Sequence, residues 1–300
     1  MKLPFLATSL LLSILLAACN RPLQQNSVPE NSTPTTLNLP TTIVYKTVTN
    51  VDTDLLSLDI HSPANAQNAP IVMWIHGGGY TIGDKANQMN NKISLFNEQG
   101  WVLVSVNYRL STPEKGAAKF PDHFLDVAAA VAWVHENIQG YGGDPNRIAL
   151  VGHSAGADIV SNVVVNPNYL REYGLELSNI ICAASLDTEG FDKTKADENE
   201  QKMWQNALSN NQNYLTETSA TLLIHPNIGI PPMLGVTRGN ERRQQIATEF
   251  IATLQEAGIE ATLIDATSLT HEEVNNQIGA AGDTVMTAPL MSFLTECFER

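Results

Sequence analysis

The chain has 300 residues, of which 43% are hydrophobic and 16% are charged, a balance typical of a globular protein and not of a disordered one. This length accommodates one large α/β domain or two small ones, and it is enough to bury a substantial core. The formal net charge of −14 at pH 7 argues against nucleic acid as a partner, because binding to phosphates requires clustered Lys and Arg. The same acidity disfavours electrostatic docking on anionic lipid.

The N-terminal residues have the pattern of a targeting segment. Lys2 supplies a positive start, and the apolar run from Leu10 to Leu16 is too short to span a bilayer but has the length of a signal-peptide core. The run ends in Leu16-Ala17-Ala18-Cys19, which resembles a bacterial lipobox, where a lipid is attached to the Cys and the chain is cut before it. We therefore predict a lipoprotein signal peptide at residues 1–18 and lipidation of Cys19. An ordinary secretory signal followed by an incidental Cys is the alternative.

The next stretch, residues 20–40, is rich in Pro, Asn, Ser and Thr and has no apolar period. Together with the lipidated Cys19 it is predicted to form a flexible tether at residues 19–40. The protein is therefore expected to be exported and anchored in the cell envelope, in the periplasm or on the outer surface, and to meet the membrane only through its lipid.

From about residue 43 onward, runs typical of strands alternate with runs typical of helices, which predicts an α/β fold with a mostly parallel central sheet and helices on both faces. The polar, Asn-rich residues 188–230, helical only around 198–209, are predicted to be an excursion over the functional end of the sheet. No other break in composition follows residue 40, so residues 41–300 are predicted to be one domain. The predicted strands are 43–48, 55–60, 71–75, 101–106, 147–151, 180–186, 232–236 and 259–264, and the predicted helices are 124–138, 155–165, 246–254 and 285–298.

The motif Gly152-His153-Ser154-Ala155-Gly156 lies between a predicted strand and a predicted helix. A chain that turns this sharply holds the serine in a strained conformation, and glycines two residues before and after it remove side chains that would collide. The hydroxyl is then exposed at a helix N-terminus, which favours developing negative charge. Ser154 is therefore the candidate nucleophile.

A second glycine-rich motif, His76-Gly77-Gly78-Gly79-Tyr80, directly follows the predicted strand 71–75. Glycines let backbone N–H groups point freely into a site, as an enzyme needs where a carbonyl oxygen becomes an oxyanion. The Lys and Ser or Thr of a phosphate-binding loop are missing. The predicted oxyanion donors are Gly78 and Gly79 from this loop and Ala155 from the serine motif.

Together these motifs resemble those of the hormone-sensitive-lipase-like esterases and the related bacterial carboxylesterases, over residues 43 to the C-terminus. The blocks that carry the resemblance are 76–80, Asn107-Tyr108-Arg109-Leu110, 141–148 (Tyr-Gly-Gly-Asp-Pro-Asn-Arg-Ile) and 152–156. The resemblance implies the α/β-hydrolase fold, a serine esterase activity and a catalytic triad in the chain order Ser, acid, His. It is far less specific for the substrate.

The base of such a triad should follow the last strand, and His271 does so, after the predicted strand 259–264 and a short turn. A serine hydroxyl is a poor nucleophile until a base takes its proton. His271 is therefore predicted to be that base.

The acid of the triad is less well defined. The resembled family carries an Asp in the turn after a strand that begins Pro-Pro; here that strand begins at Pro231-Pro232, and the family's Asp position holds Glu241. We predict Glu241 as the acid. Asp187 is the alternative, because it follows the predicted strand 180–186 and so lies at the same end of the sheet.

These residues predict a serine carboxylic ester hydrolase that acts through an acyl-enzyme on short-acyl or polymer-borne esters, with no metal or other cofactor. Members of the resembled family often carry cap helices before the first strands, whereas this chain has only the tether there, so an open site is expected. Two alternatives remain: an arylformamidase-like amide hydrolase, and a non-catalytic surface-binding protein on a hydrolase scaffold. The oligomeric state is not indicated by the sequence.

Besides Cys19 the chain has Cys182 in an apolar run and Cys297 in a helical pattern. Export permits a disulfide, but cysteines this far apart in sequence are expected to be two separate buried thiols.

Overall fold

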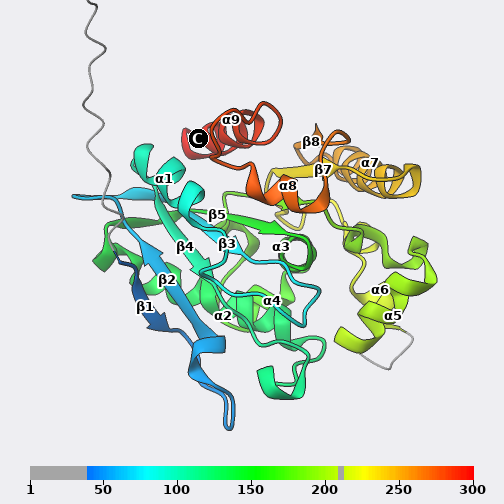
Figure 1. Ribbon diagram of the computed structural model, residues 1–300, viewed down its shortest axis with the longest axis horizontal. Coiled ribbons are helices and arrows are strands. Elements are labelled where there is room, and N and C mark those ends of the chain that lie inside the picture. The colour runs from blue at the N-terminus through cyan, green and yellow to red at the C-terminus, as the bar shows by residue number, and fades with distance from the viewer. Residues whose placement is uncertain (1–38, 209–212) are drawn as a thin grey trace, which may run out of the picture. The chain divides into compact units, whose positions relative to one another are not determined.

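The computed structural model describes residues 39–208 and 213–300 (Figure 1). The predicted signal peptide, Cys19 and nearly all of the predicted tether lie outside the described residues. Among the described helices, none combines the length and the apolar character that crossing a membrane requires.

An eight-stranded sheet forms the centre of the fold, in the order β1-β2-β4-β3-β5-β6-β7-β8. The first two neighbour pairs, β1 with β2 and β2 with β4, are antiparallel, and the remaining neighbour pairs are parallel. The prediction of a mostly parallel sheet is confirmed. The strands are β1 Thr41–Val44, β2 Ser57–His61, β3 Ala69–Ile75, β4 Val102–Val106, β5 Gly143–His153, β6 Cys182–Leu186, β7 Met233–Thr237 and β8 Ala261–Asp265.

Helices cover both faces of this sheet (Figure 1), because alternate side chains of the central strands are apolar on both sides. In β3, Ile71, Met73 and Ile75 belong to the apolar cluster on one side of the sheet, which includes buried residues of α2 Asp122–Asn137, α3 Ala155–Val165 and α7 Glu241–Glu256. Val72 and Trp74 belong to the cluster on the other side, which includes buried residues of α1 Asn90–Glu98, α8 His271–Asn276 and α9 Thr287–Phe298. The short helix α4 is Asn168–Arg171, and single 3-10 turns span Thr53–Leu56, Pro113–Lys115, Ile138–Tyr141 and Leu177–Asn179.

Residues 188–230, here called the cap segment, leave the sheet after β6 and return to it before β7. Their helices are α5 Glu198–Ala207 and α6 Tyr214–Glu217, with 3-10 turns at Gly190–Lys195 and Ala220–Leu223. Asp197 and Glu200 form a capping box that begins α5. The segment is fixed to α3 by a buried ion pair, in which Lys193 Nζ donates to Asp158 Oδ1 at 2.6 Å.

The two cysteines of the described chain are joined by a disulfide between Cys182 of β6 and Cys297 of α9, with their Cα atoms 6.2 Å apart. The expectation of two separate thiols is therefore wrong. The residues are 115 positions apart, and only the packing of α9 onto the face of the sheet that includes β6 brings them together.

Candidate active site

The serine motif forms a sharp turn between β5 and α3. Ser154 has φ 57° and ψ −120°, a conformation that non-glycine residues rarely adopt. The flanking glycines are required by contact: a Cβ on Gly152 would lie 2.3 Å from the carbonyl oxygen of Gly156, and one on Gly156 would lie 2.1 Å from that of Ile75. Ser154 is thus held at the end of β5, where its hydroxyl faces the surface.

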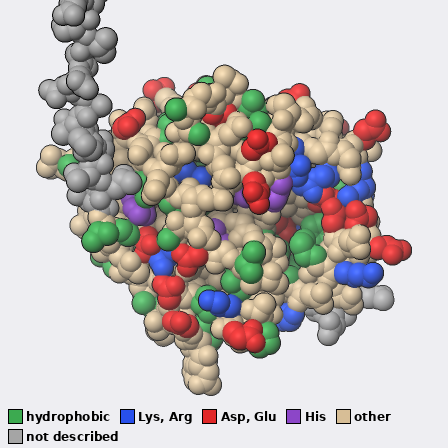
Figure 2. Space-filling model, viewed as in Figure 1, with side chains coloured by type: hydrophobic (Ala, Val, Ile, Leu, Met, Phe, Trp, Pro, Cys, Tyr) green, Lys and Arg blue, Asp and Glu red, His purple; other side chains and the backbone are tan. Residues whose placement is uncertain are grey.

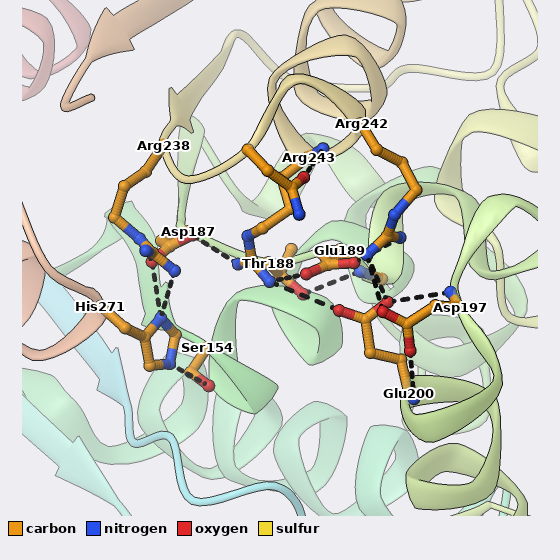
Figure 3. A network of polar contacts seen from close by, with 12 residues as sticks. Ser154, Asp187, Thr188, Glu189, Asp197, Glu200, Arg238, Arg242, Arg243 and His271 are labelled. Carbon is orange, nitrogen blue, oxygen red and sulfur yellow. Dashed lines mark hydrogen bonds and ion pairs between the residues drawn. The ribbon is translucent and has the colours of Figure 1, made fainter.

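His271 is the first residue of α8, whose capping box is formed by Thr270 and Glu273. Its Nε2 lies 2.9 Å from Ser154 Oγ, and its Nδ1 lies 2.6 Å from Asp187 Oδ2 (Figure 3). The imidazole therefore connects the hydroxyl to a carboxylate in the order that base-assisted nucleophilic attack requires.

Asp187 follows β6 directly, and its side chain is 3% exposed. Burial by itself would raise the pKa of Asp187. The hydrogen bond and charge of His271, with the guanidinium groups of Arg238 and Arg243, outweigh burial and hold the pKa of Asp187 well below its usual range. Its φ of 59° is a left-handed conformation that Asp tolerates better than most residues.

Glu241, the acid preferred from the sequence, does not occupy this position. It is exposed in the first turn of α7, while the acid that contacts His271 is the alternative, Asp187. The preference for Glu241 is therefore corrected. The physical reason is that β6 and β7 are parallel neighbours whose C-terminal ends meet, so either strand can present a carboxylate to one imidazole.

The residues that sequence reasoning missed are the arginines around Asp187. Arg243 donates to Asp187 Oδ1 at 2.7 Å, and Arg238 Nε donates to Oδ2 (Figure 3). Three arginines within six positions (238, 242 and 243), in a chain with 17 basic and 31 acidic residues, were the available signal.

The glycine loop after β3 lies against the nucleophile, since a Cβ on Gly77 would be 2.9 Å from Ser154 Cβ. Gly78 and Gly79 have φ of 118° and 57°, so the loop needs glycine at both positions. His76 supports the loop: its ring stacks on Tyr108 at 4.4 Å, and the Tyr108 hydroxyl donates to its carbonyl oxygen. Gly79 and Ala155 line the same cavity as Ser154, where predicted oxyanion donors should lie.

His153, next to the nucleophile, supports the base. Its Nε2 donates to the backbone carbonyl oxygen of His271 at 2.9 Å, and the two rings lie 4.6 Å apart. Burial, together with the charge of His271, lowers the pKa of His153 to about 3, so its ring is neutral at working pH.

Two cavities meet at Ser154 and His271. The first, of about 210 Å³, lies under the cap segment and is called the cap-side cavity; Tyr80, Met203 and Trp204 supply its largest apolar side chains. The second, of about 420 Å³, lies along the glycine loop and α8 and is called the loop-side cavity; Asn87, Gln88 and Asn275 are among its lining residues. Figure 2 shows the surrounding face, where basic and acidic side chains gather beside a histidine over the α7 and α8 region.

Within the described residues, His153, Asp187 and His271 have side-chain ligand atoms close enough together to hold a metal ion. Two of them already form the hydrogen bond described above, and the two guanidinium groups on Asp187 oppose a further positive charge. This set is therefore better suited to proton transfer than to metal binding. That no cofactor takes part stays a prediction.

A serine at a strand-turn-helix junction, an imidazole and a carboxylate on a mostly parallel sheet form the arrangement typical of a nucleophilic hydrolase of the α/β-hydrolase fold. The chain belongs to the carboxylesterase family, whose model matches residues 19–173, more than half of the chain. The resemblance seen in the motifs is thereby confirmed at the level of the family.

Among curated relatives, a probable carboxylic ester hydrolase of Mycobacterium tuberculosis, LipM, is 42% identical over 100 residues, which are 33% of this chain and 22% of the relative. Carboxylesterase 3B of Mus musculus is 36% identical over 125 residues, 39% of this chain and 22% of the relative. The chain thus spans less than a quarter of the length of the curated relatives that it matches.

Solved structures match over a larger share of the chain. A thermophilic esterase of Thermogutta terrifontis gives a TM-score of 0.69 at 22% identity, covering 87% of this chain and 92% of the other. A truncated carbohydrate esterase from gut microbiota gives a TM-score of 0.71 at 17% identity, covering 89% and 99%. At these identities the likeness supports the fold.

Proposed function

We propose that this protein is a serine carboxylic ester hydrolase with Ser154 as nucleophile, His271 as base and Asp187 as acid. The observation that carries the proposal is the continuous line from Ser154 Oγ through His271 to Asp187, with contacts of 2.9 and 2.6 Å. Family membership supports it, because carboxylesterases are named for this reaction.

The geometry allows each step of an acyl-transfer cycle. Ser154 Oγ attacks the ester carbonyl carbon while His271 Nε2 takes the hydroxyl proton, and Asp187 accepts from Nδ1–H and stabilises the imidazolium. The oxyanion is stabilised by the N–H groups of Gly78, Gly79 and Ala155. His271 returns the proton to the departing alkoxide, and water, deprotonated by the same imidazole, then releases the acid from the acyl-enzyme.

The substrates proposed are short-acyl esters or ester groups carried on polymers. Support comes from the accessibility of the site: the His271 side chain is 41% exposed, and Ser154 lines both cavities. The smaller cap-side cavity has room for a short acyl chain, and the larger loop-side cavity has room for a larger alcohol. A crystal structure with Ser154 under a closed lid would contradict this substrate class.

The first test is hydrolysis of p-nitrophenyl acetate and p-nitrophenyl butyrate by the wild type and by Ser154→Ala. Turnover by the wild type, and its loss in the variant, are expected. A fluorophosphonate probe should label the wild type and not the variant. No turnover and no labelling of folded wild type would refute the proposal.

We further propose that the protein is exported and anchored through a lipid on Cys19. The lipobox-like sequence supports this, and so does the disulfide between Cys182 and Cys297, since such bonds persist in oxidising compartments. Metabolic labelling with an alkyne fatty acid should mark the wild type and not Cys19→Ala. Equal labelling of both would overturn the anchor.

A further inference from the structure

We propose that Arg243 is a positioning residue that ties the triad acid Asp187 to the cap segment, so that the seating of α5 over the cap-side cavity and the placement of the acid depend on each other. The inference rests on the proposed esterase function and concerns how this chain holds a carboxylate that comes from β6 instead of β7.

The first step concerns Asp187. Its carboxylate accepts from His271 and Arg238 on Oδ2 and from Arg243 on Oδ1 (Figure 3). Because the side chain is 3% exposed, little water is present to take over if one of these donors is lost. The two guanidinium groups therefore fix the orientation of the carboxylate toward the imidazole.

The second step concerns the other side of Arg243. The same guanidinium forms an ion pair with Glu189, whose side chain is 3% exposed, and approaches Glu200 at 3.7 Å. Glu189 lies in the cap segment directly after Asp187 and Thr188, and Glu200 lies in the first turn of α5. One side chain thus contacts both Asp187 and the first α-helix of the cap segment.

The third step links these contacts to the substrate. Helix α5 also carries Met203 and Trp204, which line the cap-side cavity together with Ser154 and His271. A displacement of α5 by a bulky acyl group would pull on Glu200 and, through Arg243, on Asp187. Close pairs in one ionic network are coupled in this way more strongly than distant sites.

The chain offers matched controls within the same network. Arg242 pairs with Glu189 at 2.7 Å, Glu200 at 2.9 Å and Asp197 at 3.3 Å, all of them acids of the cap segment and not the triad acid Asp187. Arg238, in contrast, contacts Asp187 but not the acids of the cap segment. Arg243 is the arginine of this network that contacts both sides (Figure 3).

The charges around His271 make the acid limb of the pH–activity profile a suitable measurement for this test. A positive charge beside the Asp187–His271 pair opposes protonation of the imidazole, so removing it moves the acid limb of the pH–activity profile to higher pH. The acid limb therefore reports the contact of Arg243 with Asp187, and the acyl preference reports its contact with the cap segment. The groups concerned are Asp187 from the end of β6, Arg238 from the end of β7, Arg243 from α7, His153 from β5, Lys92 from α1, and Glu272 on α8 itself.

The experiment compares Arg243→Gln, Arg242→Gln and Arg238→Gln in the full chain, with kcat and KM for p-nitrophenyl acetate and butyrate measured between pH 5 and 9. Arg243→Gln is expected to lose about 10-fold in kcat, to change its preference between acetate and butyrate, and to shift the acid limb by roughly half a pH unit or more. Arg238→Gln should shift the limb and change the acyl preference less than Arg243→Gln does, because Arg238 lines the cap-side cavity but does not contact the acids of the cap segment. Arg242→Gln should change the preference alone.

Equal behaviour of Arg243→Gln and Arg242→Gln, or an unshifted acid limb in Arg243→Gln, would overturn the proposal. If the glutamine variant does not fold, Arg243→Lys replaces it in the experiment. Lysine keeps the positive charge, but one ammonium group cannot span both carboxylates, so this variant is expected to change the acyl preference while the acid limb stays in place. The deshielded Nδ1 proton of His271 in proton NMR gives a readout without turnover. A signal changed by Arg243→Gln in a protein without esterase activity would mean that the proposed function fails while the positioning role stands.

Discussion

Replacing Asp187 by Asn tests the acid assignment most directly. Asp187 Oδ2 accepts from His271 Nδ1 at 2.6 Å in a position that is almost fully buried. An amide at this position can donate to Nδ1 instead, which places the imidazole proton on Nε2. The protonated Nε2 can then no longer accept the proton of the Ser154 hydroxyl. The expected fall in kcat is about 10⁴-fold, equivalent to about 5.5 kcal/mol of transition-state stabilisation.

The matched control is Glu241→Gln. Glu241 is exposed at the N-terminal turn of α7, so its loss should cost about 0.3–1 kcal/mol of stability through the helix dipole and leave kcat within about twofold. The assay is p-nitrophenyl acetate hydrolysis at pH 7 and 25 °C, normalised to folded protein.

Stability has to be measured alongside activity. In Asp187→Asn, Arg238 and Arg243 keep their charges without the carboxylate between them, so the thermal midpoint should also fall. If folded Asp187→Asn keeps more than about a tenth of the wild-type kcat while Glu241→Gln collapses, the assignment drawn from the geometry is refuted.

Three further outcomes are expected. Gly78→Ala should lower kcat by about 100-fold, because a Cβ there would lie 2.0 Å from the carbonyl oxygen of Ile82 and would displace the glycine loop with its proposed oxyanion donors; normal turnover would contradict this role. Removing the disulfide by Cys182→Ala with Cys297→Ala should cost about 2–5 kcal/mol of stability, and reductant should lower the thermal midpoint of the wild type but not of the variant. Burial lowers the pKa of Lys92 to about 7 from 10.5, so between these pH values the unfolded chain binds more protons and the wild type gains stability as pH rises. The difference in unfolding free energy between wild type and Lys92→Met, from urea titrations, should therefore move in favour of the wild type from pH 6 to pH 9, and a constant difference would argue against a perturbed ammonium.

The parts of the site that the sequence predicted well depend on local backbone geometry. The turn at Ser154 needs a glycine two residues before and two residues after the serine, so its signal lies within five consecutive residues. The strand and the helix on either side are recognisable from their apolar patterns. The position of His271 could be predicted for a similar reason. It follows the last predicted strand and is the first residue of a helix whose N-cap is Thr270.

The acid and the disulfide could not be predicted with the same success, because both depend on which elements become neighbours in space. Asp187 and Glu241 each follow a predicted strand, and spacing from the Pro-Pro pair favoured the residue that the structure places in solvent. Cys182 and Cys297 come together only through the packing of the last helix on the sheet.

The meeting of β6 and β7 at one edge of the sheet also has an evolutionary consequence. Because a carboxylate on either strand can reach the same imidazole, a lineage can gain a second acid on one strand before it loses the first on the other, without a generation that lacks hydrolysis. In this chain Arg238 and Arg243, from the β7 side, hold the acid of β6. An acid returned to β7 would leave these two guanidinium groups without the carboxylate that pairs them, so the return would also cost the ion pairs that now hold Asp187.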